Sequence, residues 1–349
     1  MKSRRILIIT TVCNEGPFLL EWIAHHRALG VTDFLVFSND CTDGTDILLD
    51  RLATTGWLTH VRQTQGQKSV QWQALKLAAA HPILAQADWA MCIDCDEFVV
   101  LKSPAENLTD LIDRAQADAI ILQWRLFGHS GHLTFVDEPV AQRFTQAAPE
   151  VALFPAVTRF FKTLYRVKNG PFRKPGVHRP KQRQNARPRW VDGAGREMPD
   201  EFVANDDQIV LLPQTDPYAM VQLNHYSLRS AEDFMVKRRR GLPNRRNKKI
   251  DATYWAERNF NNVTDTSIQR HADTSRVALR GLIGLPGVAD AHDTSVKAHS
   301  QAIEDILSDP DEVTLFTRIA LLQTSVPPDK TAAQMLFQRF HGARAPKGG

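Results

Sequence analysis

The first half of the chain alternates strand-length apolar runs with segments of helical periodicity. Five runs are predicted to form strands: residues 4–13, which have the continuous apolar character of a buried strand, and residues 32–39, 57–63, 88–95 and 118–128. Four segments between them have a helical pattern: residues 16–30, 43–56, 69–81 and 107–116. Strands that alternate with helices predict an α/β fold, with a mostly parallel sheet flanked by helices.

The second half of the chain follows a different pattern. Residues 129–215 are rich in Pro, Gly and Arg, and we expect strands and long loops around a site there. From about residue 229 the pattern becomes helical and basic, with further helices expected near 267–283, 297–308 and 330–341. We therefore predict a catalytic unit over residues 1–230 and a helical, basic extension over residues 231–349.

Composition narrows the class of protein only moderately. The 349 residues are 43% hydrophobic, and the net charge of +4 is too small to indicate a partner by itself. No apolar stretch approaches the roughly 20 residues of a membrane helix, and the run at 6–13 lacks a signal-peptide cleavage site. We expect a cytoplasmic protein. Cys92 and Cys95 form a C-x-x-C pair with no second pair or nearby His, so we interpret them as packing residues.

Polar stretches follow several of the expected strands. Ligands of open parallel sheets bind outside the carboxyl ends of the strands. Four stretches fall at such ends and should meet at one edge: CNEG (13–16), SNDCTDGT (38–45), QTQGQK (63–68) and DCDEF (94–98). This edge is the predicted site.

Asp94 and Asp96 carry the sharpest chemical signal. In an extended chain they point to the same side, and two carboxylates on one face repel unless a cation lies between them. Mg²⁺ or Mn²⁺ prefers oxygen ligands, and substrate phosphates commonly complete its coordination. The acids therefore indicate a metal and a phosphorylated ligand, whereas the alternative is a solvated D-x-D loop. Asp43 likewise either binds a base or ribose or caps the next helix.

Four motifs occur in order: TVCNEGPFLLEWIAHHRALGVTDFLVFSNDCTDGT, GQKSVQWQAL, MCIDCDEFV and NHYSLRSAEDF. Together they resemble a GT-A-type glycosyltransferase of the family 2 kind, and more closely the branch that is similar to glycosyltransferase family 92. The resemblance covers about residues 4–240. It implies a nucleotide-sugar donor, a UDP-sugar in particular, a divalent metal, usually Mn²⁺, and a glycan or glycoconjugate acceptor.

The resemblance also implies roles for individual residues. It places Asn14 and Glu15 near the nucleotide, Asp40 and Asp43 at uracil and ribose, and Gln67 and Lys68 at the base or phosphates. Asp94 and Asp96 match its D-x-D motif, in which the second acid ligates the metal while the first acts on the ribose or through water. His178 and His225 are the two candidates for an additional metal-ligating His.

The catalytic base has several candidates. General-base assistance contributes about 10²–10⁴-fold to a rate, and an inverting transferase of this kind uses a carboxylate after D-x-D. Asp137 and Glu138 follow a segment that we expect to shape the acceptor pocket. Asp233 lies in a Glu-Asp pair typical of the family, but it also begins a helix, where capping explains it equally well. A retaining reaction stays an alternative.

The basic run 237–249 has three interpretations: a solvated helix face, a contact with an anionic membrane, or a contact with a diphosphate or anionic acceptor. No recognised nucleic-acid module accompanies it, so no nucleic-acid partner is expected. The leading hypothesis is a metal-dependent glycosyltransferase acting on a surface polysaccharide or glycoconjugate. The alternative is a non-catalytic nucleotide- or glycan-binding protein on a transferase scaffold. The sequence CNEGPF argues against a nucleotidyltransferase, which would have a Gly-rich basic loop after its first strand.

Overall fold

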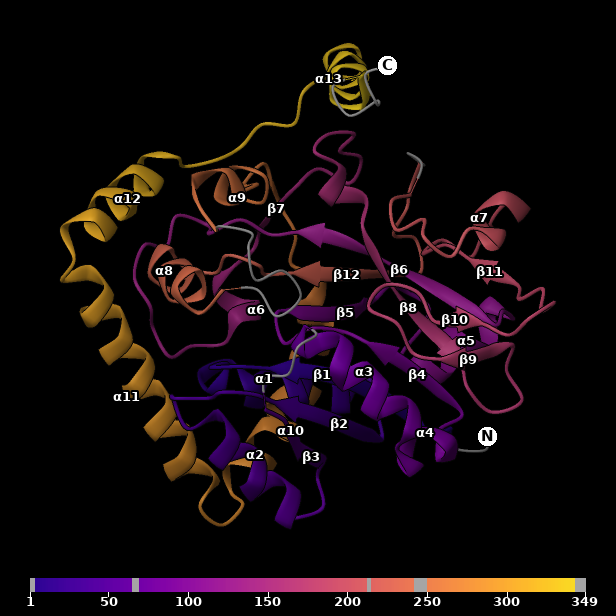
Figure 1. Ribbon diagram of the computed structural model, residues 1–349, viewed down its shortest axis with the longest axis horizontal. Coiled ribbons are helices and arrows are strands. Elements are labelled where there is room, and N and C mark those ends of the chain that lie inside the picture. Colours follow the sequence, from indigo (N-terminus) through magenta and orange to yellow (C-terminus); the bar gives the residue numbers. More distant parts are fainter. Residues whose placement is uncertain (1–3, 65–68, 212–214, 242–249, 343–349) are drawn as a thin grey trace.

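A nine-stranded sheet runs through the centre of the protein (Figure 1). The computed structural model describes residues 4–64, 69–211, 215–241 and 250–342. The sheet order is β3 (Thr59–Arg62), β2 (Asp33–Ser38), β1 (Ile6–Val12), β4 (Trp89–Cys92), β8 (Phe161–Arg166), β6 (Ala119–Leu126), β12 (Val221–His225) and β5 (Glu97–Leu101). A short ninth strand, β11 (Trp190–Val191), pairs with β6.

Most strand pairs are parallel, as the alternating pattern predicts. β1 is parallel to β2 and β4, β2 is parallel to β3, and β6 is parallel to β12. β8 runs antiparallel between β4 and β6, and β5 runs antiparallel to β12. The expected α/β fold with a mostly parallel sheet is confirmed. β5 was not predicted as a separate strand, because its apolar run begins within the acidic motif.

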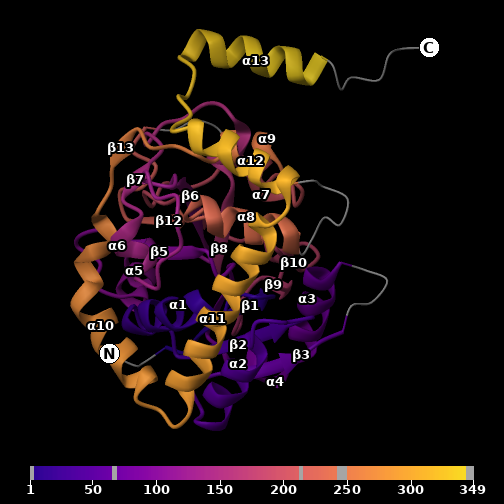
Figure 2. The same ribbon diagram turned by 90° about the vertical axis from the view of Figure 1, so that its left-hand side faces the viewer.

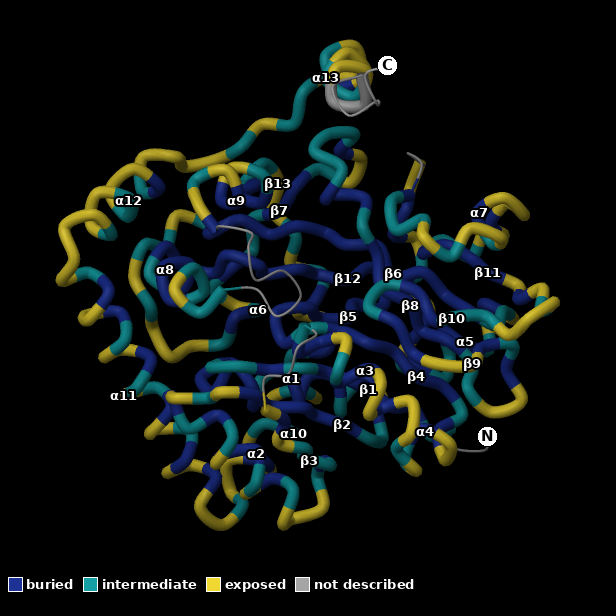
Figure 3. Tube along the Cα trace, viewed as in Figure 1, coloured by how far each residue is buried: buried dark blue, intermediate teal, exposed yellow. Residues whose placement is uncertain are grey.

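The two faces of the sheet are buried by different helices. Ile6 and Ile8 face a core that includes α1 (Gly16–Ala28), α2 (Thr45–Thr54) and α5 (Leu108–Ala115). Leu7 and Ile9, which alternate with them, face a second core with α3 (Val70–Ala80) and α4 (Pro82–Gln86). Figure 3 shows the strands buried between these layers. A strand covered on both sides explains the continuous apolar run at the start of the chain.

The remaining elements are short or lie in the second half. The short ones are α6 (Val140–Arg143), β7 (Gln146–Ala147), the 3-10 turns Ala156–Arg159 and Ser267–His271, β9 (Phe172–Lys174), β10 (Lys181–Gln182), α7 (Asp200–Ala204), α9 (Ala252–Ala256) and β13 (Val263–Thr264). The longer helices are α8 (Ala231–Arg240), α10 (Ala272–Ile283), α11 (Val288–Leu307), α12 (Pro310–Leu321) and α13 (Lys330–Gly342).

The helical second half packs onto the first. α10 lies along α1, and α11 contacts α2, α1 and α8 in turn (Figure 2). The helix expected near 330–341 is present, and the one expected near 267–283 begins at Ala272, after a 3-10 turn. The one expected at 297–308 begins earlier, at Val288, and α12 was not expected. None of the helices in the described part of the chain combines the length and the apolar character that crossing a membrane requires.

Candidate functional site

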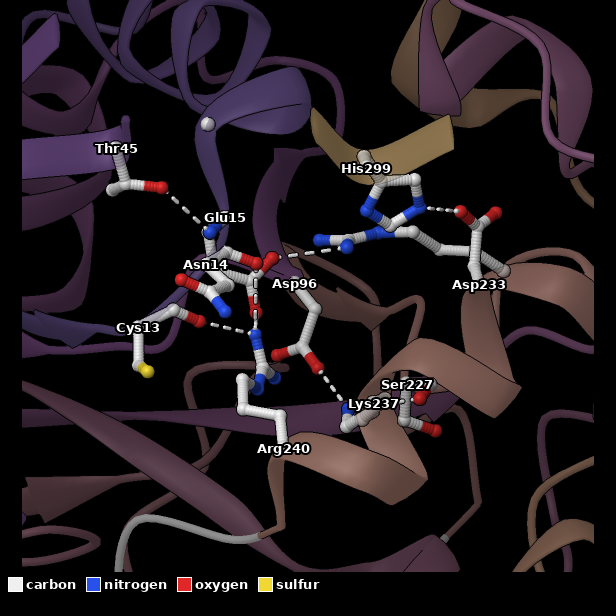
Figure 4. Close-up of polar contacts among 12 residues, drawn as sticks. Cys13, Asn14, Glu15, Thr45, Asp96, Ser227, Asp233, Lys237, Arg240 and His299 are labelled. Carbon is white, nitrogen blue, oxygen red and sulfur yellow. Dashed lines mark hydrogen bonds and ion pairs between the residues drawn. The ribbon is translucent and has the colours of Figure 1, made fainter. Parts of the chain in front are cut away.

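A small pocket lies where α1 begins, beside the carboxyl end of β1. It is lined by Asn14, Phe18, Tyr226, Ser227, Leu228, Arg229, Asp233, Val236, Lys237, Arg240 and His299. These residues come from the start of α1, the turn after β12, and the helices α8 and α11. The pocket therefore joins the carboxyl edge of the sheet to the basic C-terminal region. Figure 4 shows its polar contacts.

Helix α8 places two cations of the basic run on its inner face. The helix begins with a capping box, in which the Ser230 hydroxyl and the Asp233 carboxylate bond each other's main-chain N–H groups. Lys237 and Arg240 lie four and seven residues after Asp233, which is the spacing of one helix face. Arg238 instead pairs with Glu312 on α12, and Arg239 is exposed. The run is therefore divided between the pocket and the surface.

Glu15 holds two of the cations. Its carboxylate lies 2.6 Å from Arg240 and 3.0 Å from Arg229, and all three side chains are largely buried. Burial alone would raise the pKa of Glu15, but the guanidinium groups of Arg240 and Arg229 hold it below its usual value. Glu15 was predicted to lie near the nucleotide. It lies at that edge, but its carboxylate is bound to arginines and positions them.

Asp96 is bound by a lysine and faces a histidine. Its Oδ2 atom lies 2.7 Å from the Lys237 ammonium, and its Oδ1 atom lies 3.5 Å from Nε2 of His225. Burial would raise the pKa of Asp96, but Lys237 and His225 hold it well below its usual value. Burial lowers the pKa of His225, which favours the neutral imidazole. Asp96 is therefore an ionised carboxylate within a charged cluster.

Asp94 and Glu97 share a different lysine. Lys162 on β8 lies 2.9 Å from Asp94 and 3.4 Å from Glu97, and its side chain is 1% exposed. Gln71 on α3 donates a second hydrogen bond to Asp94, at 3.2 Å. Burial raises the pKa of Glu97 well above its usual value despite Lys162, so Glu97 is the acid of the motif most easily protonated. The two aspartates of the D-x-D motif thus have separate partners.

The donor atoms of Asp96 and His225 suit a divalent cation. Within the described ranges, no three His, Cys, Asp or Glu side chains form a ready-made metal cluster. A Mg²⁺ ion binds ligands at about 2.0–2.1 Å, so two ligands of one ion can lie up to about 4.2 Å apart. Asp96 Oδ1 and His225 Nε2 meet this condition at 3.5 Å. A neutral imidazole and one carboxylate, completed by phosphate oxygens, fit Mn²⁺ or Mg²⁺.

The two histidine candidates are placed differently. His178 is held by a 2.8 Å hydrogen bond between its Nδ1 atom and the Phe161 carbonyl oxygen, and its ring packs on Trp124. His225 also packs on Trp124, with ring centroids 4.2 Å apart, and it contacts Asp96 directly. Of the two, His225 is the residue that the fold brings to the acid.

The residues expected at the nucleotide are divided between exposed and structural positions. Asn14 lies at the rim of the pocket and accepts a hydrogen bond from the Thr42 main-chain N–H. Asp40 is exposed in the adjacent loop. Asp43 is buried and accepts hydrogen bonds from the N–H groups of Thr45 and Gly16, so it fixes the starts of α2 and α1. Gln67 and Lys68 lie outside the described residues.

The three candidate bases do not lie together. Asp137 and Glu138 are on an exposed loop, where Asp137 faces His292 and Glu138 faces Arg143. Asp233 lines the pocket, but its carboxylate caps α8 and lies 2.9 Å from Nε2 of His299. Only Asp233 among them is a pocket residue, and it already has a structural role.

Lys162 and Arg229 are two cations of the site that were not predicted from the sequence. Lys162 interrupts the largely apolar run 160–165, which overlaps β8 (Phe161–Arg166), and a single lysine in such a run was a usable signal. Arg229, Asp233, Lys237 and Arg240 repeat at intervals of four, four and three residues, which was the signal for one helix face. Cys92 and Cys95 are free and buried, which agrees with the packing interpretation.

The family model and the curated relatives that match this chain all belong to the same family. The model of glycosyltransferase family 92 matches residues 10–188, about half of the chain. A family 92 protein of Oryza sativa subsp. japonica is 26% identical over 159 residues, covering 43% of this chain and 26% of that protein. One of Arabidopsis thaliana is 24% identical over 168 residues, covering 42% and 28%. The chain therefore spans about a quarter of the length of the curated relatives it matches.

Solved structures show weaker similarity. S. aureus TarS 1-349 is 14% identical, covers 96% of this chain and 92% of its own, and has a TM-score of 0.33. The structure of TarS 1-349 in complex with UDP is 19% identical over 47% of each chain, with a TM-score of 0.30.

Proposed function

Because the chain belongs to glycosyltransferase family 92, we propose that it is a glycosyltransferase that uses a nucleotide-sugar donor, with a UDP-sugar as the leading candidate. The observation that carries this proposal is the pairing of Asp96 with His225 and Lys237 beside the pocket. An ionised carboxylate, a neutral imidazole and several cations suit a diphosphate better than an uncharged ligand.

A divalent metal is part of the proposal. Asp96 and His225 would hold Mn²⁺ or Mg²⁺, which acts as a Lewis acid and offsets the charge of the leaving nucleotide. Arg229, Lys237 and Arg240 supply further positive charge at the same place. The chain's own contribution is therefore electrostatic stabilisation of the diphosphate and positioning of the donor.

The other residues proposed to contact the donor and the acceptor are assigned from their place at the rim or in the pocket. Asn14 and Asp40, at the rim beside β1 and β2, are proposed to contact the nucleoside, together with Gln67 and Lys68. Asp233 is the proposed base among the three candidates because it lines the pocket. The proposed acceptor is a glycan or glycoconjugate, the proposed process is the synthesis of a surface polysaccharide, and the proposed transferred group is a hexose.

A peripheral contact with an anionic membrane through residues 237–249 is also proposed. Lys237 and Arg240 bind acids of the site, and Arg238 pairs with Glu312. Arg239 is the exposed cation in the described part of this run. Binding to an anionic lipid surface would therefore depend on Arg239 and on residues 242–249. Residues 242–249 lie outside the described part of the chain.

Ligand-induced stabilisation tests the donor proposal. Melting is measured with a panel of nucleotides and nucleotide sugars, with and without Mn²⁺; a ligand at 100 times its Kd stabilises by about 2.7 kcal/mol. We expect UDP with Mn²⁺ to raise the melting temperature of the wild type and not that of Asp96→Ala. Asp290→Ala, an exposed acid on α11, serves as the control. No stabilisation by any nucleotide would contradict the proposal.

Turnover separates the enzyme from a binding protein on the same scaffold. Release of nucleotide from the bound nucleotide sugar, with or without an added acceptor, is expected for the wild type. A protein that binds the donor but releases no nucleotide with any acceptor tested would favour the non-catalytic alternative.

A further inference from the structure

Lys237 forms an ion pair with Asp96, the carboxylate that is proposed to bind the metal. Its ammonium group lies 2.7 Å from Asp96 Oδ2 (Figure 4). His225 faces the other oxygen of the same carboxylate. Resting on the proposed function, we propose that Lys237 is an exchangeable counter-cation. It neutralises Asp96 until a divalent cation binds there, and it then moves to the diphosphate, so that the cation and the diphosphate bind cooperatively.

The side chain of Lys237 is suited to such a movement. Besides Asp96, its ammonium donates to the Ser227 carbonyl oxygen at 2.8 Å. Arg240, one turn further along α8, donates to Glu15 and to the carbonyl oxygens of Cys13 and Asn14. A lysine is a point charge on a flexible four-carbon stem, whereas a guanidinium is a planar group fixed by several acceptors. Arg240 is therefore anchored, and Lys237 is the cation that can change partners.

The charges of the cluster explain why exchange is required. Three carboxylates, Glu15, Asp96 and Asp233, lie beside three cations, Arg229, Lys237 and Arg240. The cluster is thus close to neutral, and a divalent cation alone would leave it strongly positive. A diphosphate that arrives with the cation restores the balance.

The pocket also holds hydrogen-bond donors with no protein partner. Nε and Nη2 of Arg229 and the hydroxyl of Ser227 are buried, and no hydrogen bond to another described residue satisfies them. Both residues line the pocket beside Lys237. Buried donors of this kind are costly unless a ligand satisfies them. Phosphate oxygens would satisfy all three and would lie within reach of Lys237.

The test compares Mn²⁺ binding in the wild type, Lys237→Met and Arg239→Met. Free Mn²⁺ is followed by its electron paramagnetic resonance signal, with and without inorganic pyrophosphate. In the wild type we expect weak binding of Mn²⁺ alone and tighter binding with pyrophosphate, by a factor within the usual range of about 5–150 for coupled sites. Lys237→Met should bind Mn²⁺ alone about tenfold more tightly and show less enhancement, whereas exposed Arg239→Met should match the wild type.

Several results would overturn the inference. One is equal affinity for Mn²⁺ alone in the wild type and Lys237→Met. Another is binding of Mn²⁺ to the wild type that pyrophosphate does not change, or no Mn²⁺ binding under any condition. If Lys237→Met does not fold, Lys237→Arg gives the opposite test, because a guanidinium fixed on Asp96 should weaken Mn²⁺ binding.

The outcomes separate this inference from the proposed function. Cooperative binding of Mn²⁺ and pyrophosphate without binding of any nucleotide would support the inference and contradict the donor proposal. Nucleotide binding with Mn²⁺ that Lys237→Met leaves unchanged, with no gain in Mn²⁺ affinity, would do the reverse.

Discussion

The indole Nε1 of Trp22 donates a 2.8 Å hydrogen bond to the main-chain carbonyl oxygen of Glu97. Glu97 begins β5, the last strand in the sheet order, directly after the two aspartates of the site. Two further side chains of α1 continue this contact: His25 lies 2.7 Å from the Val99 carbonyl oxygen, and the Val99 N–H donates to His26 at 3.2 Å. Side chains of helix α1 therefore bond main-chain groups on the edge of β5 that no strand in the described residues pairs with. These bonds fix the position of the acids directly before β5.

Trp22→Phe tests this contact. The substitution keeps an aromatic ring but leaves the buried Glu97 carbonyl oxygen without its donor, which costs about 1–3 kcal/mol. We expect the free energy of unfolding in urea to fall by that amount. Trp72→Phe, at a position whose residue is 51% exposed, should have little effect. Equal stability of the two variants would show that the hydrogen bond is unimportant.

The same contact predicts a dependence of stability on pH. Burial lowers the pKa of His25 to about 4 and that of His26 well below its usual value. Because the unfolded chain then binds more protons than the folded one, the contribution of each His is complete above about pH 6.5. It is lost as the pH falls from 6.5 toward 4, with a slope of up to about 1.4 kcal/mol per pH unit for one proton.

Urea unfolding at several pH values between 4.5 and 7.5 measures this slope. His26→Gln should be less stable than the wild type at pH 7.5 and should lose less stability on acidification. The exposed Trp72 provides the control, since Trp72→Phe changes no titratable group and should retain the slope of the wild type. An unchanged slope in His26→Gln would contradict the prediction.

Lys162 and Asp94 are expected to depend on each other. Lys162→Met removes the cation that lies 2.9 Å from the Asp94 carboxylate, and breaking a buried ion pair in this way costs about 3–5 kcal/mol. Asp94→Asn in the same chain removes the unpaired acid and should restore part of the loss. The measurement is a double-mutant cycle of unfolding free energies. Strictly additive effects of the two substitutions would show that the pair is not coupled.

Asp233 can be tested as a base separately from its role as a cap. Asp233→Asn disturbs the capping box and the contact with His299 but keeps the shape of the side chain. Ser230→Ala removes the hydroxyl that donates to Asp233 and disturbs the same cap, at a cost of about 1 kcal/mol, but it keeps the Asp233 carboxylate. If Asp233 is the base, Asp233→Asn lowers kcat by about 10²–10⁴-fold at unchanged nucleotide affinity, and Ser230→Ala does not. Equal effects on kcat would assign Asp233 to structure.

The sheet was predictable because its central strands are buried on both faces. The apolar runs that form β1, β2 and β4 have no polar alternation, and their helices separate them clearly. β8 was not predictable as the strand between β4 and β6, because the insertion of an antiparallel strand depends on contacts distant in sequence. β5 could not be recognised as a separate strand, because its sequence starts at Glu97, inside the acidic motif.

The edge of the site was predictable and its ion pairs were not. Asn14, Asp40 and Asp96 follow expected strands, and the parallel sheet brings these strand ends to one edge. The partners of Glu15 are 214 and 225 residues away in the sequence, and no local pattern connects them. The helical spacing of Lys237 and Arg240 was visible, but the direction that this face of α8 takes depends on its packing against α11.

The distance along the chain between the acids and their cations has a consequence for synthesis. Asp96 is translated 141 residues before Lys237, and Glu15 225 residues before Arg240. At about 5–20 residues per second, Asp96 emerges roughly 7–28 s before its lysine exists. The first strands can therefore assemble on the ribosome only with these carboxylates hydrated or protonated. Closure of the pocket becomes one of the last events of folding, after α8 has left the ribosome.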